Sequence, residues 1–175
     1  MDLTVGPHWP LSIPGVNPDT PDSAKKLSQG SVKVEAGTTY AGEAPAADEP
    51  LKEPWTVDEL KAVTAAKITG YDEETAAYTY DVNSMQEVTA GEDGTVHWTA
   101  PDDGDYMLFS YWMRGTGQRA QQAMNPSFEL SDPIPYTVDH FSLAGTNAFI
   151  DFWKDNMLPD DILALLREVG GSRCV

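Results

Sequence analysis

The alternation of apolar and polar positions predicts β-strands through the middle of the chain. Thr75–Val82 alternates with a period of two and carries tyrosine and valine on one face. Thr95–Thr99 and Asp105–Met113 follow, each preceded by a turn signal rich in glycine and aspartate. Asp105–Met113 (DYMLFSYWM) is apolar on both faces, so we expect it to lie at the centre of a sheet. Short polar turns between these strands indicate an antiparallel meander or a small sandwich.

Two earlier segments give weaker signals. Ser31–Glu35 (SVKVE) alternates briefly and predicts a weak strand. In Leu60–Thr69 (LKAVTAAKIT), alanine and lysine favour a helix, whereas valine, isoleucine and threonine favour a strand. The pattern leaves the choice between helix and strand open for this second segment.

The apolar period becomes helical in the last third of the chain. Ser142–Asn156 carries bulky aromatic residues at helical spacing and predicts an amphipathic helix. A second helix is expected to begin at Pro159, which suits a first turn, and to end at Gly170-Gly171. Before both, Pro135–Phe141 (PYTVDHF) reads as a short strand. A strand followed by a helix and then by glycine is half of an α/β barrel unit.

The predicted fold class is therefore α/β plus β. Leu3–Val5 is a short apolar run that opens into a loop rich in glycine and proline, which is typical of a buried strand end. We expect partial (β/α)8-barrel elements at both ends of the chain, flanking a β-rich antiparallel insertion. The expected segments are a barrel strand end and Gly/Pro-rich loop (1–40), an Ala/Pro/Glu-rich linker (41–55), the β-rich insertion (56–118), and a truncated return strand with two amphipathic helices (119–175).

Length and charge narrow the functional classes. The chain has 175 residues, whereas a closed (β/α)8 barrel typically needs about 250, so we expect a piece of a barrel. It carries 28 Asp and Glu residues against 11 Lys and Arg. This charge repels phosphate backbones and anionic membranes, which argues against nucleic acid as the main partner. The sequence contains no run of about 20 apolar residues, so it predicts no membrane-spanning helix. Met1–Pro10 does not read as a secretory signal. The location of the chain is left open.

The first candidate site is the loop that contains His8 and Trp9. Glycine and proline on both sides of this pair stiffen the loop and can hold an indole ring rigidly. Sugars stack on tryptophan because their C–H faces are apolar. The alternative is that Trp9 packs beneath its own loop.

The second candidate site is the pair Asp139 and His140 at the end of the return strand. In an α/β barrel, the carboxyl ends of the strands face the active site. Adjacent strand residues point to opposite faces, so both side chains cannot face one ligand in a regular strand. Asp139 is alternatively a cap for the following helix, although Ser142 is the more natural N-cap.

Acidic residues crowd the turns of the β-rich segment. Glycoside hydrolysis needs two carboxylates about 5–9.5 Å apart, and any two of these acids could be nominated. We interpret them as solvated turn residues, and we assign no catalytic residue and no metal ligand. The acids are Glu73, Glu74, Asp81, Glu87, Glu92, Asp93, Asp102, Asp103 and Asp105.

Three stretches in this order resemble glycoside hydrolase family 106, the α-L-rhamnosidase-type enzymes. The first is residues 2–10 (DLTVGPHWP), and the third is residues 136–142 (YTVDHFS). Between them lie residues 95–101 (TVHWTAP) and 105–118, which resemble the end of the family's β-rich excursion. The resemblance covers most of the chain.

The resemblance implies a (β/α)8 barrel with added β domains that hydrolyses terminal deoxysugars from plant or microbial glycans. It implies that His8 and Trp9 line the sugar pocket and that Asp139 and His140 lie at the barrel rim, so these four residues are the expected substrate-binding set. The family's catalytic carboxylates lie on later strands, so the isolated chain is expected to be inactive. It implies an extracellular parent protein and calcium in that parent, while no cofactor is expected for this chain.

A non-catalytic carbohydrate-binding or structural β-rich module is the alternative. Four aromatic residues of the middle segment motivate it, namely Trp98, Tyr106, Tyr111 and Trp112. Exposure of these side chains would favour binding, and burial would favour a role in the core. Because Asp105–Met113 is apolar on both faces, the sequence favours the core.

Overall fold

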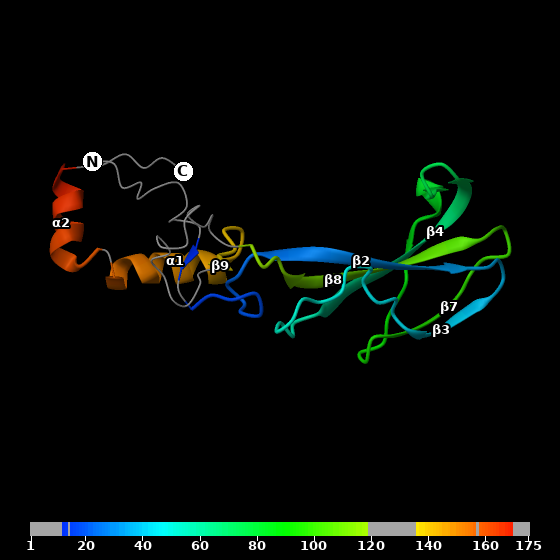
Figure 1. Ribbon diagram of the computed structural model, residues 1–175, viewed down its shortest axis with the longest axis horizontal. Helices are drawn as coiled ribbons and strands as arrows, with labels where there is room; N and C mark the ends of the chain where they lie inside the picture. Colours follow the sequence, from blue (N-terminus) through cyan, green and yellow to red (C-terminus); the bar gives the residue numbers. More distant parts are fainter. Residues whose placement is uncertain (1–11, 14, 119–135, 157, 170–175) are drawn as a thin grey trace. The chain divides into compact units, whose positions relative to one another are not determined.

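The computed structural model describes residues 12–13, 15–118, 136–156 and 158–169 (Figure 1). Strands hold 41% of these residues and helices hold 19%, so the described part of the chain is mainly β. In chain order the elements are β1 (Ser12–Ile13), β2 (Lys25–Val34), β3 (Thr39–Glu43), β4 (Glu59–Asp72), β5 (Ala77–Tyr80), the 3-10 helix η2 (Val82–Ser84), β6 (Gln86–Glu87), β7 (Thr95–Thr99), β8 (Tyr106–Gly115), β9 (Tyr136–Thr137), α1 (Leu143–Asn156) and α2 (Asp160–Val169).

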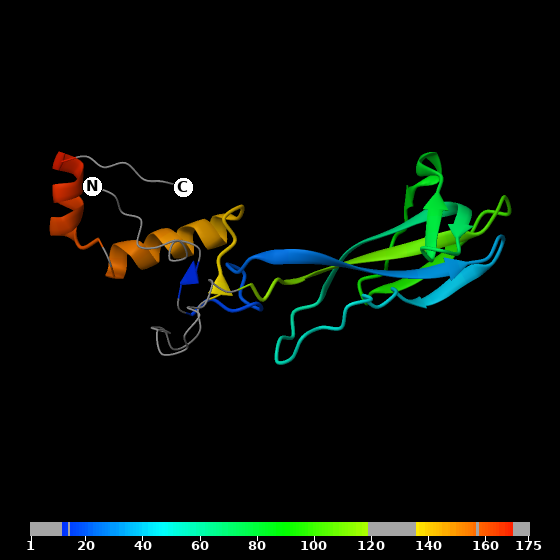
Figure 2. The ribbon, with the colours of Figure 1, turned by 45° about the horizontal axis from the view of Figure 1, so that its top comes forward.

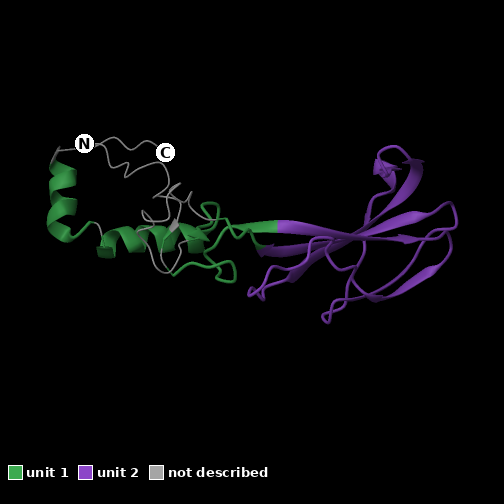
Figure 3. Cartoon of the chain, in the orientation of Figure 1, with its two compact units in different colours: residues 1–26, 115–175 green, residues 27–114 purple. Residues whose placement is uncertain are grey.

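The chain divides into two compact units (Figure 3). The first comprises residues 1–26 and 115–175, and the second comprises residues 27–114. The division falls within β2 and within β8, which are neighbouring strands of one sheet. The chain therefore enters and leaves the second unit through adjacent strands.

The main sheet of the second unit has the strand order β2-β8-β4-β5 (Figures 1 and 2). β4 pairs antiparallel with β8, β5 and β6. β8 lies inside the sheet, and Tyr106–Ser110 are all buried. The prediction of a central strand that is apolar on both faces is therefore confirmed.

Leu60–Thr69, which the sequence left open, lies entirely within the strand β4. Its partner β8 is apolar on both faces and needs a strand with small or branched side chains beside it. Val63 and Ala65 enter one buried cluster, and Ala66 enters another. Tertiary pairing therefore overrides the helical preference of alanine and lysine.

β5, η2 and β6 follow one edge of β4 as a single interrupted strand. Tyr80 pairs with Ile68 at the end of β5, and the backbone then leaves the ladder through η2. Ser84 repairs the gap, because its hydroxyl accepts the Lys67 N–H at 2.8 Å. The predicted strand therefore ends at Tyr80, and Val82 is 77% exposed in the interruption.

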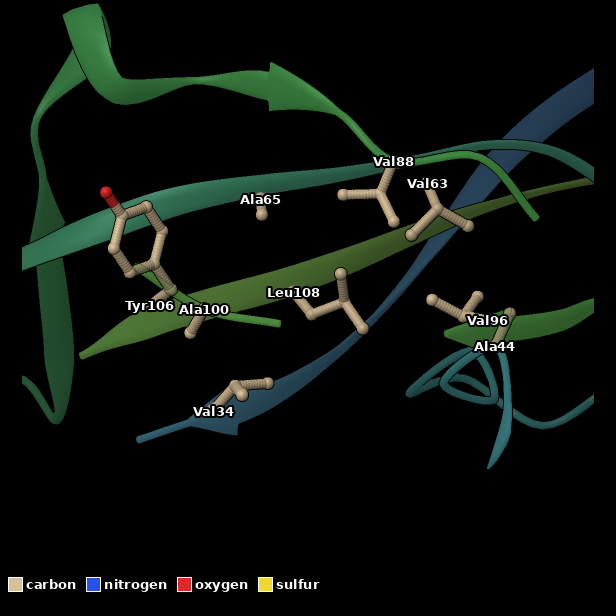
Figure 4. Close-up of a cluster of buried hydrophobic side chains, with 9 residues drawn as sticks. All are labelled: Val34, Ala44, Val63, Ala65, Val88, Val96, Ala100, Tyr106 and Leu108. Carbon is tan, nitrogen blue, oxygen red and sulfur yellow. The ribbon is translucent and has the colours of Figure 1, made fainter. Parts of the chain in front are cut away.

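The main core of the second unit packs one face of the sheet against the antiparallel pair β3 and β7 (Figure 4). β3 and β7 are in register from Thr39↔Thr99 to Glu43↔Thr95. The buried residues come from strands and from the loops between them. They are Val34, Ala44, Val63, Ala65, Val88, Val96, Ala100, Tyr106 and Leu108.

The first unit has a smaller core. β1 pairs antiparallel with β9, and Ser23 forms an isolated bridge with Val138. Phe149 of α1 packs with Val138, Ile13 and Val16 in one buried cluster. Helices are found where the sequence predicted them, and none among the described residues has the length and apolarity that a membrane crossing requires.

The predicted barrel elements are wrong. Neighbouring strands of a (β/α)8 barrel are parallel, whereas β1 and β9 are antiparallel, and the main sheet is a curled antiparallel half-barrel. The error has a physical origin. A strand followed by a helix fixes the local period of the chain, but it does not fix the direction of the strand that will pair with it.

Candidate functional site

Asp139 and His140 are the part of the predicted site that the structure describes, and they lie in the turn after β9, which ends at Thr137 rather than reaching Phe141 as predicted. His8 and Trp9 lie outside the described residues. The Asp139 N–H donates to the Asp22 carbonyl at 2.7 Å, next to the bridge between Ser23 and Val138. This bonding joins the end of β9 to the loop that precedes β2.

The Asp139 carboxylate has a structural partner. Its Oδ1 accepts the Phe141 N–H at 3.0 Å, which closes a tight turn before α1. A Cβ atom at Gly145 would lie 2.1 Å from the Asp139 carbonyl oxygen, so the helix approaches this turn very closely. One carboxylate oxygen therefore holds the turn, and Asp139 is half-buried.

His140 is exposed and lies beside the core rather than in it. Its ring meets Phe149 edge-on, with 6.2 Å between the ring centroids and 78° between the planes. Ser142 caps α1, since its hydroxyl accepts the Gly145 N–H at 3.0 Å. Ser142 is therefore the cap that the sequence favoured, while Asp139 closes the preceding turn.

Lys25 lies in the same region and was not singled out from the sequence. Its Nζ donates to the Pro18 carbonyl at 2.9 Å, to the Ser23 hydroxyl at 2.6 Å and to the Thr20 carbonyl. All three donors of the ammonium are used. Burial lowers the pKa of Lys25, and three nearby carboxylates oppose that shift, namely Asp22, Asp19 and Asp139.

These contacts give Lys25 a structural role. The ammonium ties the loop before β2 together and neutralises part of the acidic charge around it. Asp22 Oδ1 is buried with no hydrogen-bond partner among the described residues. The described residues contain no group of three or more His, Cys, Asp or Glu side chains that could hold a metal ion. They do not fit the calcium that the resemblance implies for a parent protein.

The acids of the second unit stabilise turns and ion pairs. Asp72 Oδ1 accepts the Glu74 N–H at 2.9 Å, and Asp93 Oδ1 accepts the Thr95 hydroxyl at 2.6 Å. Lys67 pairs with Asp103 at 2.9 Å, and Lys33 pairs with Asp105 at 2.7 Å. Each of these carboxylates therefore has a local structural partner.

The electrostatics of these carboxylates oppose a role as a general acid. Hydrogen bonds from Thr75 and Thr95 lower the pKa values of Asp72 and Asp93 respectively. Lysine hydrogen bonds lower the pKa values of Asp103 and Asp105. A glycosidase general acid needs a raised pKa in order to hold its proton near neutral pH. These four carboxylates stay ionised instead.

The aromatic residues that motivated a binding module are in or against the core. Tyr106 is 4% exposed, and its ring meets Trp98 at a centroid distance of 5.7 Å. The Trp112 Nε1–H donates to the Pro45 carbonyl at 2.9 Å. Tyr111 packs against the smaller cluster on the opposite face of the sheet. None of these four side chains forms an exposed platform.

An exposed aromatic pair lies elsewhere, on the hairpin formed by β4 and β5. Tyr71 and Tyr78 are register partners with ring centroids 4.6 Å apart and planes tilted by 46°. Tyr71 is 52% exposed and Tyr78 is 36% exposed. The sequence predicted a strand at Tyr78, but its pattern did not identify Tyr71 as the partner. The signal was the acidic turn after Tyr71, which folds β5 back alongside it.

The comparisons with known proteins assign no family to the chain. No protein-family model matches it, and neither characterised proteins nor solved structures yield a match.

Proposed function

We propose that this chain is the non-catalytic, glycan-binding part of a glycoside hydrolase of the α-L-rhamnosidase type. Its partner is a carbohydrate that carries terminal deoxysugars. The observation that carries the proposal is the order of three motifs, at residues 2–10, at residues 95–101 with 105–118, and at residues 136–142. β1 begins two residues after the first motif, and it pairs with β9 inside the third motif. This pairing involves residues 12–13 and 136–137, and residues 2–10 lie outside the described part of the chain.

The non-catalytic part of the proposal follows from the carboxylates. Asp103 and Asp105 have lowered pKa values and are paired with lysine. Asp139 uses one oxygen to close a turn. Asp103 and Asp105 are therefore poor proton donors, which supports a non-catalytic role for this part of the chain.

The test combines hydrolysis and calorimetry on the purified chain. We expect heat on titration with rhamnose-containing polysaccharides and no release of phenol from aryl α-L-rhamnosides. Turnover at an ordinary enzymatic rate would contradict the non-catalytic part. A lack of heat with every rhamnose-containing glycan would contradict the glycan-binding part.

A purely structural β-rich module is the second candidate. The burial of Tyr106 and the packing of Trp98 and Trp112 against the core favour it, because those side chains contribute to stability rather than to a surface. This candidate predicts that no glycan of any composition binds. Saturable binding of any oligosaccharide would exclude it.

A further inference from the structure

Tyr71 and Tyr78 form an exposed aromatic pair in the second unit. Because their rings are exposed, they contribute less to stability than buried rings would. Aromatic side chains bury large areas in cores, as Tyr106 and Phe109 do here. Tyr71 and Tyr78 instead keep much of their ring surface in water, and their tilt of 46° leaves each ring an open face. Two adjacent exposed rings on paired strands form an aromatic platform with two tilted faces.

The curl of the sheet brings a polar pair towards this platform. β2 and β5 are separated in the sheet by β8 and β4, so Lys33 and Tyr78 would lie far apart in a flat sheet. The hydrogen bond from Lys33 to Asp105 is the main cause that raises the pKa of Lys33, and a smaller electrostatic contribution comes from Tyr78. The backbone links the same groups, because the Ile68 N–H donates to the Asp105 carbonyl at 2.8 Å and Ile68 pairs with Tyr80, two residues from Tyr78.

A second contact on the same face of the sheet reaches across β4. Tyr80 of β5 meets Phe109 of β8 edge-on, with 5.3 Å between the ring centroids, although β4 lies between their strands. Strands two positions apart in a flat sheet are separated by about 9.5 Å. The long side chains of Tyr80 and Phe109 bridge this spacing and pack together over β4.

The polar pair offers both donors and acceptors to a ligand. The Lys33 Nζ lies 2.7 Å from Asp105 Oδ2, and both side chains are more than a third exposed. Asp105 Oδ1 accepts the Ala36 N–H at 3.1 Å, which holds the carboxylate in one orientation. A ligand hydroxyl can accept from the ammonium and donate to the carboxylate without a change in backbone.

The combination of rings and ion pair fits one ligand class. A pyranose ring has apolar C–H faces that stack on aromatic rings and an edge of hydroxyls that needs donors and acceptors. Anionic ligands are disfavoured by the formal net charge of −17 and by Asp72, Glu73 and Glu74, which follow Tyr71 directly. A neutral saccharide meets no such repulsion.

We propose that Tyr71 and Tyr78 stack against a neutral pyranose ring whose hydroxyls bind Lys33 and Asp105. The inference rests on the proposed function only for the source of the sugar. The platform itself would bind any neutral pyranose, including rhamnose. All four residues of the site belong to the second unit.

The experiment titrates the full chain with two sets of neutral oligosaccharides, one rhamnose-terminated and one free of rhamnose. Binding is followed by calorimetry and by amide chemical shifts. We expect saturable binding with shift changes concentrated at residues 69–80 and at Lys33. Tyr71→Ala and Tyr78→Ala are expected to weaken binding roughly tenfold each, whereas Tyr71→Phe keeps the ring and the affinity.

Val82→Ala is the matched control, because Val82 is an exposed apolar side chain beyond the end of β5. It should leave the affinity unchanged, and the thermal transition of each variant checks that the fold is retained.

Two results separate this inference from the proposed function. Rhamnose-terminated sugars that bind equally well to wild type and to Tyr71→Ala would overturn the inference and leave the proposed function standing. Tyrosine-dependent binding of rhamnose-free sugars alone would support the inference and overturn the rhamnosidase assignment. Absence of binding to both sets would overturn the platform.

Discussion

At the scale of single residues, the ion pair between Arg114 and Asp58 is the best-buried charge contact described. The Arg114 Nε and Nη2 atoms donate to the two carboxylate oxygens of Asp58 at 2.7 and 2.6 Å, and Nη1 donates to the Glu49 carbonyl. Arg114 is 5% exposed. Such a planar, two-pronged contact is one that arginine makes and lysine does not.

Replacing Arg114 should therefore lower the free energy of unfolding far more than replacing a surface lysine. Arg114→Met is expected to lower the free energy of unfolding by about 2–4 kcal/mol, because Asp58 loses its partner in a partly buried position. Arg114→Lys should fall between wild type and Arg114→Met. Lys61→Met, which breaks the exposed pair with Glu59, should change it by less than about 1 kcal/mol. Urea unfolding measures all three, and equal effects for Arg114 and Lys61 would refute this account.

The exposed lysine–aspartate pairs give the second unit a defined pH window. The pKa values of Asp103 and Asp105 are lowered from 3.8, so their stabilisation is complete above that pH and is lost as the pH falls through the lowered values. The pKa values of Lys33 and Lys67 are raised from 10.5, so the same pairs weaken again as the pH rises above 10.5.

We expect a declining urea midpoint below pH 3.8, with a smaller decline in Asp103→Asn. High salt screens exposed pairs, so 1 M NaCl should reduce the difference between the variant and wild type. A variant that loses as much stability in acid as wild type would contradict the assignment.

At the scale of elements, two strand glycines differ in what surrounds them. A Cβ atom at Gly30 of β2 would lie 2.1 Å from the Ala46 carbonyl oxygen, which is backbone and cannot swing aside. A Cβ atom at Gly42 of β3 would meet only the Tyr40 hydroxyl, at 3.9 Å. The same substitution should therefore have different effects in the two strands.

Gly30→Ala is expected to lower the free energy of unfolding by about 1–3 kcal/mol, because the strand and the 45–46 loop must separate. Gly42→Ala is expected to change it by less than about 0.5 kcal/mol. Thermal unfolding of the two variants side by side is the measurement. Similar midpoints for both would show that the loop does not press on β2.

The elements were predictable where the local period is decisive. β8 and both helices follow from their apolar spacing. β4 was open, because its small and branched side chains suit either a helix or a strand until β8 is placed beside it. The antiparallel pairing of β1 and β9 was missed, because the direction of a partner strand is a long-range property.

In the candidate site, too, local features were predictable from the sequence and long-range features were not. The cap at Ser142 was readable from the sequence, whereas Asp139 and His140 follow the strand β9 instead of lying within it. The exposure of Tyr71 and Tyr78 was not readable, because the alternation of a strand marks two faces without saying which one the sheet will cover. The curl of the sheet decides that.

At the scale of the whole molecule, the second unit has the features of an independent folding unit. Its main buried cluster and the smaller one, which contains Ala66, Met107 and Phe109, lie entirely within residues 27–114. The chain enters and leaves it through the neighbouring strands β2 and β8. Cutting both strands at the unit boundary removes no member of either cluster.

A chain of residues 27–114 should therefore fold alone. We expect a single cooperative thermal transition, and amide chemical shifts that match those of the same residues in the full chain away from the new ends. A broad transition, or a collapsed spectrum with few dispersed amides, would show that the other unit is needed for folding.

The loop that presses on Gly30 also covers part of the exposed edge of β2. β2 is the outermost strand of the sheet, and an outermost strand with free backbone groups invites other chains to pair with it and aggregate. The Asp48 N–H donates to the Gln29 carbonyl at 2.9 Å, beside the point where Ala46 meets Gly30. The segment that reads as a linker thus occupies part of that border and leaves fewer free backbone groups there for another chain to pair with.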